Sequence, residues 1–272
     1  MKPWEELQKN IYIMAELEGI SGIYTEDQIE PHRPRFEEGR RLMTREVNIC
    51  ATALKANGVD KIFVRDVHGG SYTLLWEELS SNIDVVASGW TGTKRFPGIE
   101  ECDGVILLGY HAMAGSEGSL LEHTMIRRAY RRFCLNGTPV GESGLDAAIL
   151  GEYNKPVIMI SGSRDACAQA KELLPWVTTA VVKDDAGDCG ALLLSPERSA
   201  ARLREAIDEA VAALRNNKVR TFTVSHPVTM QIDCTSAERV PSTENKPYMT
   251  VTGPTSYEVT GSTVEETLWR VF

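Results

Sequence analysis

Short apolar segments that alternate with helical stretches constrain the fold of this chain more than any other feature of its sequence. Segments that are apolar on both faces, and not only on one, are typical of strands in a parallel sheet that helices cover on both sides. Helical stretches between such strands are typical of βαβ units. The apolar segments lie at residues 11–15, 61–65, 83–88, 104–109, 156–161 and 178–183.

The stretch between the first two apolar segments has the periodicity of a helix. Apolar residues recur there at steps of four, three and four residues, at Met43, Val47, Cys50 and Leu54. This spacing places them on one face of a helix over residues 39–57. Further helices are predicted at residues 139–154, 165–174 and 196–217. The chain is therefore predicted to be an α/β protein, with a mostly parallel sheet flanked by helices.

The composition and the hydrophobic pattern of the sequence change after residue 217. The remaining residues are rich in Thr and Val and alternate only partly between polar and apolar. We expect a smaller C-terminal α+β part there. The predicted division is a metal-binding α/β domain at residues 1–195 and a smaller α+β domain at residues 196–272.

Composition excludes some classes of partner. The net charge of −9 argues against non-specific binding to nucleic acid and against docking on anionic membranes. No apolar run approaches the roughly 18 residues that span a bilayer, and residues 1–10 lack the apolar core of a signal peptide. The six cysteines are widely spread without a CxxC pair, which favours reduced thiols packed as small hydrophobic residues. We expect a cytoplasmic protein.

Potential metal ligands follow the ends of the predicted strands. In open parallel sheets, ligands bind beyond the carboxyl ends of the strands. Carboxylates and imidazoles are the ligands of zinc and related hydrolytic metals. The sequence therefore predicts a metal site at this edge of the sheet. The candidates are Glu16 and Glu18 after the first strand, Asp66 and His68 after the second, His111 after the fourth, and Glu142 near the start of a helix.

Each candidate also has a plainer interpretation. A single histidine after a strand is more often a hydrogen-bonded structural residue, and acidic residues near Glu16 are compatible with a solvated loop. Glu142 is compatible with a first-turn acid that the helix dipole favours. The metal site is predicted because all of these residues meet at one end of the sheet. His32 and His226 follow no such pattern and are interpreted as structural or surface residues.

Several motifs, in order and at similar spacing, resemble those of the zinc-dependent D-aminopeptidases, a bacterial family often encoded with dipeptide-transport genes. The matches cover most of the first two-thirds of the chain, and the C-terminal residues match loosely. The motifs are "ELEGISGI", "FEEGRRLMTREVN", "VRDVHGG", "LLGYHAMA", "EHTM", "PVGESGLDA" and "ELLPWVTTAVVK".

The resemblance implies a two-domain α/β subunit with two zinc ions, assembled into a homo-oligomer such as a decameric ring. It implies an enzyme that releases N-terminal D-amino acids from short peptides through a metal-activated water. No nucleotide cofactor is implied, and no G-x-G-x-x-G follows the first strand. By position, His123 matches the catalytic histidine of the family. The metal ligands would be Glu16, Glu18, His68, His111 and Glu142.

The chain departs from the family pattern in two places. The family has Asp-x-Glu where this chain has Glu16-Leu17-Glu18. Glutamate is longer than aspartate by one methylene, about 1.5 Å of reach, which changes where its carboxylate would meet a metal ion. Asp66 is therefore an alternative to Glu16 as the ligand at this position. The stretch around Ser163 and Arg164 is less acidic than its family counterpart. We therefore expect the substrate pocket to differ in shape from that of the family.

Two other functions remain open from the sequence. The first is an amidase or lactam hydrolase that uses the same metal site on a small amide that is not a peptide. The second is a metal-binding oligomeric protein without catalysis, which would bind metal and turn over no amide.

Overall fold

The computed structural model describes residues 9–89, 91–187 and 190–272. Cys189 and residues 1–8 of the charged N-terminal segment lie outside these ranges. The five cysteines within them are buried and form no disulfide, as the sequence predicts. No helix in the described ranges is both long and apolar enough to cross a membrane.

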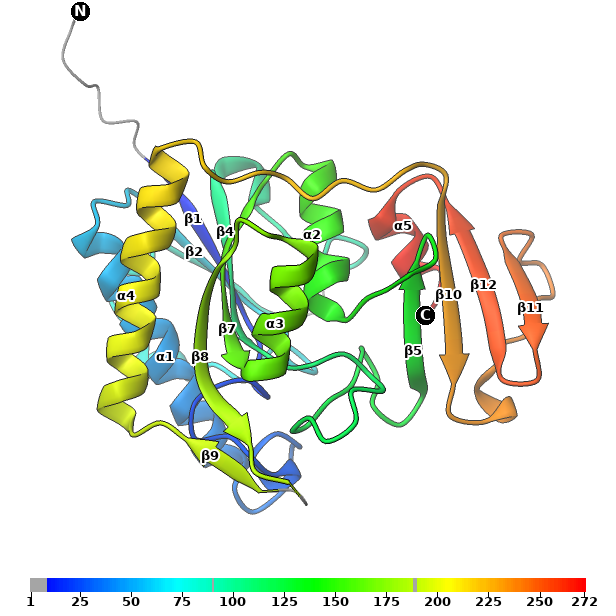
Figure 1. Cartoon of the computed structure of the whole chain (residues 1–272), viewed down its shortest axis with the longest axis horizontal. Coiled ribbons are helices and arrows are strands. Elements are labelled where there is room, and N and C mark those ends of the chain that lie inside the picture. The colour runs from blue at the N-terminus through cyan, green and yellow to red at the C-terminus, as the bar shows by residue number, and fades with distance from the viewer. Residues whose placement is uncertain (1–8, 90, 188–189) are drawn as a thin grey trace, which may run out of the picture.

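A large sheet with mostly parallel strands forms the centre of the molecule (Figure 1). Its strand order is β3-β2-β1-β4-β7-β8-β9, and among the described strands of this sheet only the β8–β9 pair is antiparallel. Each apolar segment predicted from the sequence forms one of these strands, so that prediction is confirmed. The strands are β1 (Ile11–Ala15), β2 (Ile62–Asp66), β3 (Val85–Ala87), β4 (Gly104–Tyr110), β7 (Val157–Ser163), β8 (Thr178–Asp185) and β9 (Ala191–Leu193).

Helices cover both faces of the large sheet. Helices α1 (Phe36–Ala56) and α4 (Pro196–Arg215) pack against each other, on the left in Figure 1. Helices α2 (Glu142–Glu152) and α3 (Arg164–Leu173) lie on the opposite face. Strand β1 shows why its sequence is continuously apolar. Ile11 and Ile13 contribute to the core under α1 and α4, whereas Tyr12 contributes to the core on the other side.

A smaller antiparallel sheet lies beyond α2, with strand order β11-β12-β10-β5-β6. The apolar face of this sheet shares a core with α2, which is buried almost all round. Helix α5 (Val264–Trp269) packs against β10 and β12 of the same sheet. The strands are β5 (Tyr130–Leu135), β6 (Thr138–Pro139), β10 (Val228–Cys234), β11 (Met249–Gly253) and β12 (Ser256–Gly261). Short 3-10 helices occupy Glu26–Gln28, Trp76–Glu78, Ile99–Glu101 and Ala237–Arg239.

The two sheets do not divide the chain at residue 195. Helix α4 lies after that point but packs on β7 and β8 of the large sheet. Strand β5 lies before it but pairs with β10 of the small sheet. Strands β5 and β6 were not predicted from the sequence. The α/β class with a mostly parallel sheet and a smaller α+β part is confirmed.

The strand order reverses between β1 and β4. From β1 the chain builds outward through β2 to β3, and it then returns to place β4 on the other side of β1. The connections after β1 and β4 therefore leave in different directions and open a crevice at the carboxyl ends of these strands. Candidate ligands follow both strands, so the fold brings them to this crevice.

Candidate metal centre

The chain segments after β1 and β4 lie in close contact. The Glu16 amide donates to the Leu108 carbonyl oxygen at 2.8 Å, and the Gly19 amide donates to the Gly109 carbonyl oxygen at 2.7 Å. Gly109 has a φ of +75°, and a Cβ there would lie 2.3 Å from the Glu16 carbonyl oxygen. Glycine is therefore required for the approach of these two segments.

Glu16, Glu18 and His68 form the first of two groups that could hold a metal ion. His68 Nδ1 lies 2.7 Å from Glu16 Oε1 and 3.1 Å from Glu18 Oε2. His68 Nε2 lies 2.8 Å from the Ile29 carbonyl oxygen. Because a carbonyl oxygen only accepts, Nε2 carries a proton and Nδ1 faces the two carboxylates. This arrangement orients the ring as metal-binding histidines are oriented.

Asp66 shapes the loop that carries His68. Its carboxylate accepts backbone N–H groups from His68, Thr73 and Leu74, at 3.2, 2.5 and 3.1 Å. The side chain is fully buried, and it belongs to neither group of candidate ligands among the described residues. Asp66 therefore fixes the loop, whereas Glu16 belongs to a group of side chains that could hold a metal ion.

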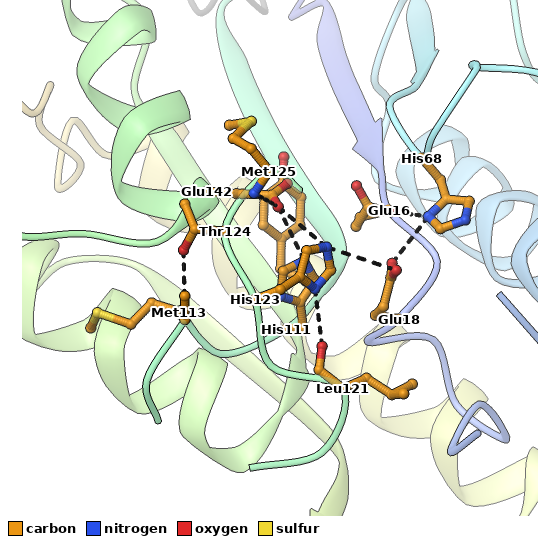
Figure 2. A network of polar contacts seen from close by, with 12 residues as sticks. Glu16, Glu18, His68, His111, Met113, Leu121, His123, Thr124, Met125 and Glu142 are labelled. Atoms are coloured by element: carbon orange, nitrogen blue, oxygen red, sulfur yellow. Dashed lines mark hydrogen bonds and ion pairs between the residues drawn. The ribbon is translucent and has the colours of Figure 1, made fainter. Parts of the chain in front are cut away.

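His111, His123 and Glu142 form the second group. The two rings are stacked, with centroids 3.9 Å apart, and Glu142 Oε1 lies 3.5 Å from His111 Nε2 and 3.6 Å from His123 Nε2. Figure 2 shows both imidazoles facing this carboxylate. The loop between the histidines thus returns His123 to the site, as the resemblance implies.

Backbone groups orient the second group. His111 Nδ1 lies 3.0 Å from the Ala112 carbonyl oxygen, and His123 Nδ1 lies 3.1 Å from the Leu121 carbonyl oxygen. Each ring therefore donates from Nδ1 and presents Nε2 to the site. Glu142 begins α2, and its Oε1 accepts the Met125 amide at 2.8 Å.

Glu18 links the two groups (Figure 2). Its Oε2 contacts His68, while its Oε1 lies 4.0 Å from His123 Nε2. Glu18 is 3% exposed, so both oxygens face protein groups. A carboxylate that faces two adjacent ligand groups is suited to contact two metal ions at once.

Burial and close charges shift the pKa values of these groups. Burial and the Glu18 carboxylate raise the pKa of Glu16 to about 8. Burial also acts to raise the pKa of Glu142, but the His111 and His123 imidazoles lower it to about 2. Burial opposes charge on His111, yet the Glu142 carboxylate raises the pKa of His111 to about 9. Carboxylates and imidazoles so closely placed can exchange protons for a divalent cation.

The donor set fits zinc. It consists of imidazole nitrogens and carboxylate oxygens, which are common zinc ligands. His111 Nε2 is buried and has no hydrogen-bond partner, although a buried polar atom is normally paired. A metal ion near Glu142 would satisfy it. The structure thus brings together all five predicted ligands, Glu16, Glu18, His68, His111 and Glu142, with the predicted catalytic residue His123.

A cavity of about 660 Å³ opens onto both groups. This volume is within the range of small-molecule sites. Its lining combines carboxylates, imidazoles, arginines and apolar side chains. The lining residues are Glu16, Glu18, Ile29, Glu30, Pro31, Val67, His68, Gly69, Arg95, His123, Met125, Ile126, Arg127, Arg128, Glu142, Trp269 and Phe272.

Lys183 of β8 supports the segment after β1, and sequence reasoning missed it. Its side chain is 2% exposed, and its ammonium donates to the carbonyl oxygens of Glu18, Ile20 and Ile23. Burial lowers the pKa of Lys183 to about 7. The lysine thereby fixes the backbone that carries Glu18.

A second supporting network was also missed. Asp146 binds the Arg95 guanidinium through both carboxylate oxygens and accepts the Tyr110 hydroxyl at 2.6 Å. Asp146 follows Glu142 by four residues, so both lie on one face of α2. That spacing is the signal that points to Asp146. The network joins the end of β4 to the start of α2.

Comparison with known proteins agrees with this arrangement. A family model described as D-aminopeptidase matches residues 10–272. A D-aminopeptidase from Bacillus subtilis (strain 168) is 34% identical over 217 residues, which cover 78% of this chain and 77% of that protein.

A solved structure is also similar. It is the zinc-dependent D-aminopeptidase DppA from Bacillus subtilis, described as a self-compartmentalizing protease, with a TM-score of 0.88 and 29% sequence identity. The match covers 96% of this chain and 94% of DppA. The family model spans the C-terminal residues as well, where the sequence motifs match only loosely. The resemblance predicted from the sequence is confirmed, and the chain belongs to the D-aminopeptidase family, whose members hydrolyse peptide bonds.

Proposed function

We propose that this protein is a zinc-dependent aminopeptidase that releases N-terminal D-amino acids from short peptides. The observation that carries the proposal is the pair of ligand groups that lie next to each other through Glu18 and His123 and open onto one cavity. The similarity to DppA, a zinc-dependent D-aminopeptidase, supports the metal and the substrate class.

In this proposal, Glu16, Glu18 and His68 would hold one zinc ion, and His111 and Glu142 would hold a second. Bound zinc acts as a Lewis acid and activates water near neutral pH. The backbone carbonyls behind the imidazoles keep the ligand nitrogens aimed at the site. Burial of the carboxylates excludes bulk water, which strengthens their interaction with a cation.

His123 is the proposed proton carrier. Its Nδ1–H is held by the Leu121 carbonyl oxygen, so Nε2 is the nitrogen that faces the cavity. Burial lowers the pKa of His123, which favours a neutral ring near neutral pH. A neutral Nε2 can take up a proton and deliver it to the leaving amine.

The test combines metal content with a hydrolysis panel. Zinc per subunit is measured by elemental analysis, and matched D- and L-aminoacyl peptides, simple amides and lactams are assayed. About two zinc ions with preferential cleavage of D-aminoacyl peptides is the expected result. Turnover restricted to non-peptide amides, or bound zinc without turnover of any amide, would reject the proposal in favour of the amidase or of the non-catalytic metal-binding protein.

We also propose that the protein is a cytoplasmic homo-oligomer, with the decameric ring of the family as the expected assembly. The support is the self-compartmentalizing description of DppA together with the high structural similarity. Sedimentation velocity of the zinc-loaded protein measures the assembly directly. A monomer at all concentrations would contradict it.

A further inference from the structure

A second cavity, of about 150 Å³, lies beside the metal centre. It shares four lining residues with the large cavity, namely Val67, Gly69, Arg95 and Trp269. Val67 and Gly69 flank His68 in the chain, so the two cavities meet at the loop that carries this proposed ligand. The remaining lining residues are Arg65, Gly70, Ser71, Gly89, Thr91 and Lys94.

The charge around this small cavity is of one sign. Its described lining includes three cationic residues, Arg65, Lys94 and Arg95, and no acidic residue. The large cavity, by contrast, is lined by carboxylates as well as arginines. The small cavity therefore favours an anion and disfavours a cation.

Arg65 is the most informative of these residues. It is 7% exposed, and its guanidinium donates to two neutral acceptors, the Gly89 carbonyl oxygen at 3.0 Å and the Thr91 hydroxyl at 3.3 Å. Arg65 Nε is buried and has no hydrogen-bond partner. Its neighbour Asp66 is directed to backbone amides of its own loop. Within the described ranges, Arg65 is thus a buried cation without a carboxylate partner, which is costly unless something else pairs with it.

Arg95 and Lys94 play different parts. The charge of Arg95 is already paired with Asp146, and its backbone amide donates to Glu265 Oε1 at 2.7 Å, so Arg95 forms a fixed wall. Lys94 is exposed and forms no ion pair with another described residue. The charges that remain available to a ligand are therefore those of Arg65, inside, and Lys94, at the rim.

We infer that this small cavity is an oxyanion-binding subsite, built around Arg65 and Lys94, next to the metal centre. Its volume suits a group of the size of a carboxylate or a sulfate. Given the proposed aminopeptidase activity, on which this part of the inference rests, the ligand is the terminal carboxylate of a short peptide whose N-terminal bond lies at the metals. A free inorganic oxyanion has the same chemistry and is the other source.

The first arm of the test compares a free-acid substrate with its amide. The ratio of kcat/KM for D-alanyl-glycine over D-alanyl-glycinamide is measured for the zinc-loaded wild type, for Arg65→Met and for Lys94→Met. Loss of a hydrogen bond between charged groups should lower this ratio about tenfold to a hundredfold for Arg65→Met and less for Lys94→Met. Arg132→Met, an exposed residue paired with Asp233 on the small sheet, should leave the ratio unchanged.

The second arm needs no catalysis. The melting temperature is followed against sodium sulfate, with sodium chloride at equal ionic strength as reference. The wild type should show a saturable rise that both variants lack. This arm separates a failure of the subsite from a failure of the proposed activity, because it gives a result even if no peptide is cleaved. Lys94 is exposed, so Lys94→Met decides the question if Arg65→Met does not fold.

The outcomes distinguish the ligand. A lower acid-to-amide ratio in the variants supports binding of the substrate carboxylate. An unchanged ratio with loss of the sulfate response supports a free oxyanion as the ligand. If both variants keep the wild-type ratio and the wild-type response to sulfate, the subsite does not exist.

Discussion

At the scale of single residues, the site depends on backbone carbonyls as much as on its ligands. Each of the imidazoles at the centre donates one ring N–H to a carbonyl oxygen, those of Ile29, Ala112 and Leu121. The other ring nitrogen of each then faces the carboxylates. The loops that follow the strands therefore set the tautomers, since each carbonyl belongs to such a loop.

Replacement of His123 separates proton transfer from metal binding. His123→Ala should lower kcat by about a hundredfold to ten-thousandfold, the usual contribution of a general acid or base. Zinc content should stay near that of the wild type, because all five proposed ligands, Glu16, Glu18, His68, His111 and Glu142, are unchanged. Elemental analysis and steady-state kinetics measure the two effects. His226→Ala, at an exposed histidine before β10 that lies 3.8 Å from Glu152, serves as control. Full activity of His123→Ala would remove this residue from the mechanism.

Lys183 should make stability depend on pH. Because burial lowers its pKa to about 7, the folded protein binds fewer protons than the unfolded chain between pH 7 and the ordinary lysine value. Stability attributable to Lys183 should therefore rise with pH across this window, by up to about 1.4 kcal/mol per pH unit, and be flat below it.

The measurement is urea unfolding of the wild type and of Lys183→Met at several pH values. The difference in unfolding free energy between the two should move in favour of the wild type as pH rises from 7 to 10. Lys61→Met, at an exposed lysine, should give a constant difference. A constant difference for Lys183→Met as well would show that burial does not perturb this ammonium.

The proposed ligands could be predicted from the sequence, but the residues that support them could not. Glu16, His68 and His111 could be placed because each follows a predicted strand, and strand ends of a parallel sheet converge. Nothing in the sequence marks Lys183 as buried, since it ends an apolar segment where an exposed lysine is equally common. Arg95 lies in a loop, and its contact with Asp146 depends on how that loop folds back over α2.

At the scale of elements, the reversal between β1 and β4 creates the site. The two strands are neighbours in the large sheet, and their connections depart to opposite sides. The continuous apolar sequence of both strands predicted their burial. The same reasoning missed β5, because "YRRFCL" carries two adjacent arginines and pairs with β10, whose residues lie about a hundred positions later. Such distant pairing leaves no local signal.

The approach of these two segments can be tested at Gly109. Gly109→Ala should destabilise the protein about 1–3 kcal/mol more than Gly137→Ala. Both glycines have positive φ, +75° and +83°, so the backbone strain is comparable. A Cβ at Gly137 meets nothing within 4 Å, whereas one at Gly109 meets the Glu16 carbonyl oxygen.

Chemical denaturation gives the two free energies, and zinc titration gives the affinity of each variant. Gly109→Ala should also weaken zinc binding, because it displaces the backbone of Glu16. Equal losses of stability for the two variants would mean that the close approach is not constrained.

At the scale of the whole molecule, the proposed zinc ligands follow three strands or begin a helix, and these elements are far apart in the chain. Zinc at these residues would connect the ends of β1, β2 and β4 with the start of α2, and its binding should stabilise the folded state. Zinc at a hundred times its dissociation constant contributes about 2.7 kcal/mol per site. For a chain of this size, each kcal/mol of stabilisation raises the melting temperature by roughly 2–4 °C.

Calorimetry with and without a chelator measures this contribution. The chelated protein should melt earlier but keep its helical circular dichroism at 25 °C, since both apolar cores persist without metal. Zinc added back should restore the transition. A melting temperature that is indifferent to chelation would argue against zinc ligands in the core of the fold.

The pairing of β5 with β10 also has a consequence for synthesis. Leu135 of β5 lies opposite Met230 of β10, and chains are made from the N-terminus. When the ribosome has reached residue 195, every proposed zinc ligand and all strands of the large sheet have been translated. Strand β5 then has β6 as its neighbour, but not yet β10. We expect the nascent chain to carry a strand edge with unpaired backbone N–H and C=O groups at this stage, which is the interval in which a chaperone would protect it from pairing with other chains.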